Sequence, residues 1–205
     1  MQKKLILNIL GVFFLALGIL AMINTIYQGV NYGVDLASIL WFSYIGMILL
    51  GIAILKKDSD LVLSQINILG IPYVFWNIDF FYYLIKGKTL FGLVDYFFES
   101  GALFGKIISA QHLITIPLGL FAIYLIGLKT KNAWKLSFIQ IFIVFIITRI
   151  ATTPAENVNC VFKNCANFDF GIPYVLEWFL SYLIMIFITN WIICRIFYKN
   201  KKIKK

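Results

Sequence analysis

The amino-acid sequence predicts an all-α polytopic membrane protein, a bundle of six transmembrane helices that forms a single transmembrane domain over residues 1–205. Hydrophobic residues make up 61% of the 205-residue chain, and its mean hydropathy is +0.90. Only 13% of the residues are charged, whereas soluble globular domains are about a quarter charged. The apolar residues also fall in stretches of about 20, the length that a helix needs to cross a bilayer.

The apolar stretches predict the spans in order. We expect them at approximately 5–26, 36–55, 61–85, 107–128, 133–152 and 173–197. The first stretch follows Lys3 and Lys4, as in a signal peptide. Its apolar core is longer than the roughly 7–15 residues of a signal peptide, and no small-residue cleavage pattern closes it. We therefore expect it to be a retained anchor.

The positive charges predict the orientation of the bundle. If the N-terminus is cytoplasmic, most of the 18 Lys and Arg residues lie on the inner side, including those of the tail KNKKIKK at 199–205. The positive-inside rule then favours two cytoplasmic termini. We expect a multi-pass protein of a prokaryotic plasma membrane.

The net charge of +9 has the same explanation. Lysines in cytoplasmic loops contact anionic lipid headgroups, so membrane lipids are the expected partners. No basic stripe interleaved with base-stacking aromatic residues lies between the spans, and we expect no nucleic-acid partner. The sequence predicts no particular oligomeric state.

Two connections on the expected outer side are longer than a turn. Residues 86–106 carry Asp95, Glu99 and Lys106 at near-helical spacing, which predicts an interfacial or re-entrant helix between spans three and four. Residues 153–172 are polar and rich in asparagine, so we expect a loop or lid.

Two cysteines, Cys160 and Cys165, lie in the polar loop. They can close a small disulfide ring if the loop faces an oxidising compartment, and they stay free thiols if it does not.

Four ionisable side chains lie inside the expected spans: Asp79, His112, Arg149 and Glu177. At about 1.5 Å of rise per residue, all four lie within roughly 10 Å of the outer boundary. Charge at membrane depth is costly, and the side chains that carry it usually face the bundle interior. Uncharged polar residues accompany them, namely Asn77, Gln111, Asn157 and Asn159. We therefore expect a polar cavity that opens to the outer side.

These residues support acid–base chemistry. A histidine beside a carboxylate is a general base with an orienting partner, so His112 and Asp79 are the candidate catalytic residues. Arg149 suits a phosphate or carboxylate, and Glu177 would pair with it. The candidate substrate-binding residues are Arg149, Glu177, Asn77, Gln111, Asn157 and Asn159.

Two questions stay open at the level of the sequence. The nucleophile is Cys160, Ser109, Thr115 or an activated water. A purely structural explanation is the alternative, in which Arg149 and Glu177 form an ion pair or extend to the headgroups. Because the chain has a single histidine, we expect no metal site and no cofactor.

Three segments carry a resemblance to a known family. They are AQHLITIPL at 110–118, NVNCVF at 157–162 and GIPYVLEWF at 171–179, over about the C-terminal half of the chain. They resemble YwaF-like integral membrane proteins and the related androgen-induced-gene-type transmembrane acyltransferases and hydrolases. The chain departs from that pattern at GKTLFGLVDYFF, residues 87–98, where a stretch richer in Pro and Thr is expected. The resemblance implies a lipid-directed role with His112 at its centre.

The leading functional hypothesis is therefore a lipid-directed hydrolase or acyl transferase that uses His112. The alternative is a non-catalytic membrane protein that binds or transports a small polar solute or ion. The inner halves of the expected spans carry few polar residues, chiefly Asn8, Asn67 and Gln140, and that scarcity disfavours transport.

Overall fold

The computed structural model describes residues 2–33, 35–99, 103–166 and 170–198, and no β-strand occurs in these ranges. The lysine-rich tail at 199–205 lies outside the described residues. In chain order the helices are α1 (Gln2–Tyr32), η1 (Leu36–Leu40), α2 (Phe42–Lys56), α3 (Ser59–Lys86), α4 (Asp95–Phe98), α5 (Leu103–Ser109), α6 (Gln111–Ile126), α7 (Ala133–Ala151), η2 (Val158–Cys160) and α8 (Tyr174–Phe197).

Six helical segments are long and apolar enough to cross a membrane. They are Gln2–Tyr32, Leu36–Lys56, Ser59–Lys86, Leu103–Ile126, Ala133–Ala151 and Tyr174–Phe197. The predicted all-α bundle is confirmed, and the chain is a multi-pass membrane protein. The second and fourth segments are each broken once, the second at Trp41 and the fourth at Ala110.

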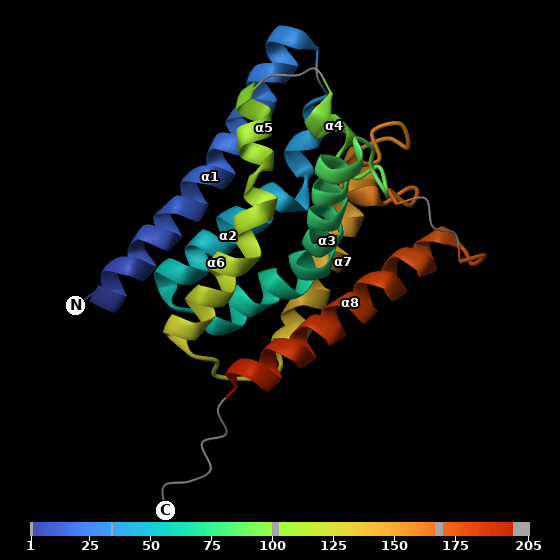
Figure 1. Cartoon of the computed structure of the whole chain (residues 1–205). Helices are drawn as coiled ribbons and strands as arrows, with labels where there is room; N and C mark the ends of the chain where they lie inside the picture. Colours follow the sequence, from blue (N-terminus) through green and yellow to red (C-terminus); the bar gives the residue numbers. More distant parts are fainter. Residues whose placement is uncertain (1, 34, 100–102, 167–169, 199–205) are drawn as a thin grey trace, which may run out of the picture.

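Helix α3 lies at the centre of the bundle. It packs against α2 and α6 on one side and against α7 and α8 on the other (Figure 1). One apolar core fills the space between α1, α2, α3 and α6, and a second lies between α3, α7 and α8. The central position explains why α3 carries more of the buried polar residues than any other helix that the structure describes.

Helices α1 and α2 pack backbone to backbone. A Cβ added at Gly51 would lie 2.6 Å from the backbone nitrogen of Leu15 and 2.7 Å from the carbonyl oxygen of Gly11. Small residues that permit such close approach are typical of helix pairs in membranes. The two helices therefore form a tight hairpin at the edge of the bundle (Figure 1).

The connection between α3 and α5 contains less helix than the charge spacing suggested. Its only described helical part is α4, a single turn at Asp95–Phe98. Helix α3 ends at Gly87, which has a φ of +69°, and the chain turns again at Gly92, with a φ of +77°. These left-handed positions fold the connection back against α3 rather than along a continuous helix.

The bundle has two ends, which differ in their residues. The disulfide end carries the Cys160–Cys165 loop, the ends of α1, α3 and α7, and the starts of α5 and α8 (Figure 1). The opposite end carries the α2–α3 and α6–α7 connections and the end of α8. All four of the ionisable residues predicted for the site lie in the half nearer the disulfide end.

Candidate functional site

The ring of His112 is held between aromatic side chains. It stacks on the indole of Trp76, with centroids 4.6 Å apart and planes 14° from parallel, and it contacts Tyr73 at 4.4 Å. Its Nδ1 lies 2.7 Å from the carbonyl oxygen of Ser109. A carbonyl oxygen only accepts hydrogen bonds, so Nδ1 carries the proton and Nε2 of the neutral ring holds the lone pair. The Gln111 amide nitrogen lies 3.1 Å from Nδ1 and 3.4 Å from Nε2, and it can donate to the Nε2 lone pair.

Polar neighbours on α3 and α6 surround this ring. The Gln111 amide and the Tyr73 hydroxyl are hydrogen-bonded at 3.0 Å, and the Thr115 hydroxyl donates to Gln111 Oε1 at 2.7 Å. Asn77 donates to the backbone carbonyl of His112 at 3.1 Å. The expected proximity of Asn77, Gln111 and His112 is therefore present in the structure.

The carboxylate of Asp79 is fully buried and is bound by the following loop. Its Oδ1 accepts the backbone N–H groups of Leu90 at 2.6 Å and Phe91 at 2.9 Å. Its Oδ2 accepts those of Leu93 at 2.7 Å and Val94 at 3.2 Å. Successive backbone N–H groups form a concave anion-binding site, and here the anion is a side chain of the same chain.

The expected hydrogen bond between Asp79 and His112 is absent from the described residues. Four amides surround the carboxylate, and the Ser109 carbonyl accepts the proton of His112 Nδ1. The partner that orients the histidine ring is therefore a backbone carbonyl of α5. Asp79 instead fixes the loop that follows α3.

The Arg149 guanidinium extends over the polar loop. Its Nη1 donates to the carbonyl oxygen of Val161 at 2.6 Å, and the group lies 4.9 Å from the ring centroid of Phe162 and 5.5 Å from that of Phe145. Glu177, on the first turn of α8, is buried and accepts the Asn164 amide at 2.9 Å.

The expected ion pair between Arg149 and Glu177 is not formed in the part of the chain that the structure describes. Both side chains bind the loop between α7 and α8 instead: Arg149 donates to the Val161 carbonyl, and Glu177 accepts from the Asn164 amide. Two charges on consecutive spans at the same depth thus need not face each other.

The loop itself is organised by its two asparagines. Asn157, at a φ of 44°, accepts the backbone N–H groups of Phe162 and Lys163, each at 3.0 Å. A disulfide joins Cys160 to Cys165 within the same loop.

Asn159 extends from the loop into the bundle. Its Oδ1 accepts the Phe42 N–H at 2.7 Å, and its Nδ2 donates to the Leu40 carbonyl at 2.9 Å and to the Thr148 hydroxyl at 3.0 Å. Its backbone carbonyl accepts the indole N–H of Trp178 at 3.1 Å. One buried side chain thereby joins η1, α2 and α7.

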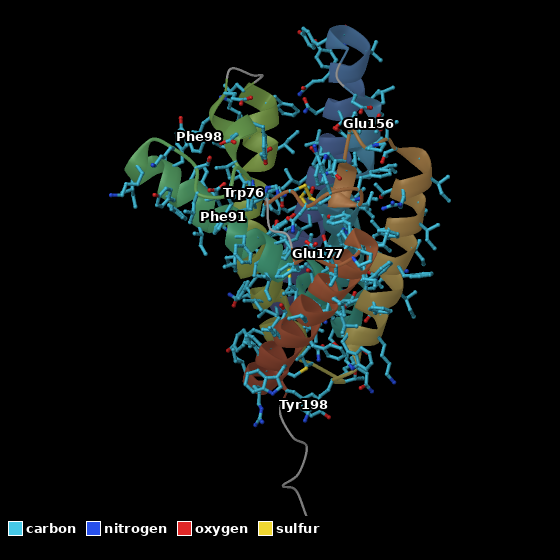
Figure 2. All side chains as sticks on the ribbon, turned by 90° about the vertical axis from the view of Figure 1, so that its right-hand side faces the viewer. Trp76, Phe91, Phe98, Glu156, Glu177 and Tyr198 are labelled. Carbon is cyan, nitrogen blue, oxygen red and sulfur yellow. A yellow bond between two sulfur atoms is a disulfide. The ribbon has the colours of Figure 1, made fainter. Side chains whose placement is uncertain are left out.

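Apart from Asp79, which binds the loop at 90–94, and the disulfide-bonded Cys160 and Cys165, the predicted site residues form two groups. The His112 group, on α3 and α6, contains His112, Gln111 and Asn77. The loop group, on α7, η2 and α8, contains Arg149, Glu177, Asn157 and Asn159. Figure 2 shows Trp76, which marks the first group, beside Phe91 and Phe98 on one side of the molecule, and Glu177 on α8 away from them.

The open space near these groups is mostly apolar. An open groove of about 450 Å³ runs along α3 and is lined by Val74, Asn77, Ile78, Phe81, Tyr82 and Ile85. Asn77 Oδ1 is buried there without a hydrogen-bond partner. A second space, beside Asn159 and Tyr182, measures about 10 Å³, the size of one water. In place of the expected polar cavity, the structure has a mostly apolar groove in which Asn77 is the one amide side chain.

Sequence reasoning missed the aromatic partners of the histidine. Tyr73 and Trp76 are three residues apart on α3, and Trp76 in turn donates to the hydroxyl of Tyr96 at 3.1 Å. The spacing was a usable signal, since residues i and i+3 share a helix face. No group of three or more His, Cys, Asp or Glu side chains that could hold a metal occurs among the described residues.

Comparison with known proteins adds no assignment. No family model, no curated protein and no solved structure matches the chain. The resemblance to YwaF-like proteins stays a prediction from the three sequence segments.

Proposed function

We propose that this protein is a lipid-directed membrane enzyme, a hydrolase or acyl transferase, in which His112 is the general base. The hydrogen bond from Nδ1 to the Ser109 carbonyl, at 2.7 Å, is the observation that carries the proposal. It leaves Nε2 as the basic atom of the ring, as general-base catalysis requires. Stacking on Trp76 fixes the ring plane.

The groove along α3 supports a lipid as the substrate. Five of its six lining side chains are apolar or aromatic, as a surface that contacts an acyl chain requires. Asn77 lines the groove, and its Nδ2 donates to the His112 backbone carbonyl at 3.1 Å. One side chain therefore connects the groove to the helix turn that carries the base.

The other predicted residues take supporting roles in this proposal. Asp79 positions the loop at 90–94 rather than the histidine. Arg149 uses one of its five N–H donors on Val161, and the remaining donors suit a phosphate or carboxylate headgroup.

We also propose that the disulfide end faces the extracytoplasmic side of a prokaryotic plasma membrane and that both termini are cytoplasmic. A disulfide persists in an oxidising compartment, and Lys56, Lys57, Lys129 and Lys131 lie at the opposite end. A cysteine introduced at Lys163 should react with a membrane-impermeant maleimide on intact cells, and one introduced at Lys131 should not. Labelling with the reverse pattern would refute the orientation.

The catalytic proposal is tested by lipid mass spectrometry. Membranes from cells that express the wild type, His112→Gln or Asn132→Gln at equal levels are compared, with the exposed Asn132 at the opposite end as the control. The wild type and the control should change the same lipid species, and His112→Gln should change none. A change that survives in His112→Gln would refute the assignment of the base.

A second candidate function is the binding or transport of a small polar solute or ion without catalysis. One observation favours it: the half of the bundle away from the disulfide contains a buried cluster of amides and hydroxyls. This cluster is richer than the sequence suggested. No lipid change in any variant would favour this candidate over the enzyme.

A further inference from the structure

Buried amides and hydroxyls from three spans meet between α3, α7 and α8, in the half of the bundle nearer the opposite end. Asn67 Nδ2 lies 3.2 Å from both Ser137 Oγ and Asn190 Oδ1. Asn190 in turn donates to the backbone carbonyl of Lys131 at 3.1 Å. We call Asn67, Ser137, Thr189 and Asn190 the α3–α7–α8 cluster.

A second set of polar side chains adjoins the cluster. The Gln65 amide donates to Gln140 Oε1 at 2.8 Å and to Ser64 Oγ at 3.1 Å. The Ser137 hydroxyl links the two sets through the Ser64 carbonyl at 3.3 Å. All of these groups are neutral.

Three oxygen atoms in the two sets have no hydrogen-bond partner within the described part of the protein. In the part of the chain that the structure describes, four buried side-chain oxygen or nitrogen atoms have no partner, and three of them lie here: Gln65 Oε1, Asn67 Oδ1 and Thr189 Oγ1. Asn67 and Gln65 are fully buried, and Thr189 is 9% exposed. Buried polar atoms in proteins are nearly always paired, with protein or with ordered water, so three unpaired oxygens in one region point to a missing donor.

Glycines bring the helices close together beside two of these oxygens. A Cβ at Gly70 would lie 3.1 Å from Thr189 Cγ2, and a Cβ at Gly46 would lie 2.9 Å from Leu69 Cδ1. Gly70 is about one helical turn after Asn67 on α3, so Thr189 packs against α3 next to the cluster. Packing this close leaves no room for a ligand larger than one or two heavy atoms.

We propose that the α3–α7–α8 cluster is an internal binding site for a small neutral hydrogen-bond donor, and that its resident ligand is water. The ligand donates because the two unpaired amide oxygens, Gln65 Oε1 and Asn67 Oδ1, can only accept, and the Thr189 hydroxyl can accept as well. It is neutral because the cluster contains no carboxylate, and a buried cation without a counter-charge is strongly disfavoured. The site is separate from the groove and from His112, and it does not depend on the proposed catalysis.

The substitution Thr189→Val tests the site because valine has the shape of threonine without the hydroxyl. If a bound donor satisfies Thr189 Oγ1, the substitution removes a hydrogen bond and should lower the melting temperature by about 2–4 °C. If the site is empty, the substitution removes an unpaired buried hydroxyl and should raise the melting temperature. An increase, or no change, would overturn the proposal.

Thr25→Val is the matched control. Thr25 is also a buried helical threonine, and its hydroxyl donates to the carbonyl of Ala21 at 3.1 Å. The decrease in melting temperature that it causes calibrates the loss of a buried threonine hydroxyl that is hydrogen-bonded, here to Ala21 and Tyr44. Thr189→Val should show a decrease of similar size.

A structure of the wild-type protein in lipid nanodiscs, at a resolution that shows ordered water, is the second measurement. It applies even if Thr189→Val does not fold. Density within hydrogen-bonding distance of Asn67 Oδ1 and Thr189 Oγ1 is the expected result. Direct packing of these atoms with no density between them would overturn the proposal.

Discussion

Replacing Asp79 by asparagine is expected to destabilise the protein far more than its conservative chemistry suggests. The carboxylate accepts four backbone N–H groups, two on each oxygen, and it is fully buried. An asparagine of the same shape keeps one oxygen. Its NH₂ group then faces two N–H donors, whichever way the amide is turned.

The magnitude follows from those two donors. Leaving a buried donor unsatisfied costs about 1–3 kcal/mol, so Asp79→Asn should lower the free energy of unfolding by about 2–6 kcal/mol. For a chain of this length, 1 kcal/mol shifts the melting temperature by about 2–4 °C, so the melting temperature should fall by at least ~4 °C.

The assay can use the protein's own thiol. Cys194 is a buried free cysteine, while Cys160 and Cys165 are joined, so a thiol-reactive fluorophore reports unfolding when Cys194 becomes accessible. Asp95→Asn is the control, because Asp95 is exposed and accepts a hydrogen bond from Thr89. It should change stability by no more than about 0.5 kcal/mol.

The reasoning would be refuted by an Asp79→Asn protein that melts together with the wild type and the control. That result would mean that the loop at 90–94 does not depend on the negative charge. The loop would then have to be held by the aromatic contacts of Phe91, such as its edge-to-face pairing with Phe75 at 5.4 Å.

Two further predictions concern packing and the loop. Gly51→Ala should destabilise the α1–α2 hairpin by about 1–3 kcal/mol, because the new Cβ would lie 2.6 Å from the Leu15 backbone nitrogen. Gly105→Ala is the control and should be tolerated, because the nearest contact of its Cβ would be 3.4 Å. Equal melting temperatures for the two variants would contradict the close packing of α1 and α2. Replacing Cys160 and Cys165 together by serine should lower the free energy of unfolding by about 2 kcal/mol, because the disulfide no longer closes a ring with a sequence separation of 5 in the unfolded chain. Reducing agent should lower the melting temperature of the wild type but not that of the double variant.

The spans were predictable because hydropathy is a local property. Each apolar stretch matched a helix to within a few residues, and the main exceptions were α1, which extends to Tyr32, and the broken second and fourth spans. The break at Ala110 lies just before His112. It allows the Ser109 carbonyl to accept from the histidine ring instead of acting only within a helix.

The partners of the charged residues were not predictable from depth. Depth along a helix says how far a side chain lies from the boundary, but it does not say which way the side chain points. The actual partners of these side chains are backbone groups, which side-chain identities do not reveal: backbone N–H groups bind Asp79, and the Val161 carbonyl binds Arg149. Every residue carries such groups, so only the folded loop determines which of them are within reach.

The polar cluster away from the disulfide could have been found from the sequence. Asn67 lies in the first turns of α3, Ser137 in the first turns of α7, and Asn190 in the last turns of α8. The alternating direction of the spans brings these positions to one level. The depth of an amide or hydroxyl side chain can be estimated from its position along the span, as was done for the four ionisable residues.

The contacts of Asn159 impose an order on assembly. The first N–H of α2, that of Phe42, is satisfied by a side chain 117 positions later in the chain, and the Leu40 carbonyl by the same side chain 119 positions later. The α1–α2 hairpin is synthesised first, yet the start of α2 lacks its capping partner until the loop after α7 has been translated. Once the loop arrives, Trp178 on α8 closes over it through the Asn159 carbonyl. The loop after α7 thereby completes the hydrogen bonding at the start of the second span, and a chain stopped before residue 159 would leave the first turn of α2 without this partner.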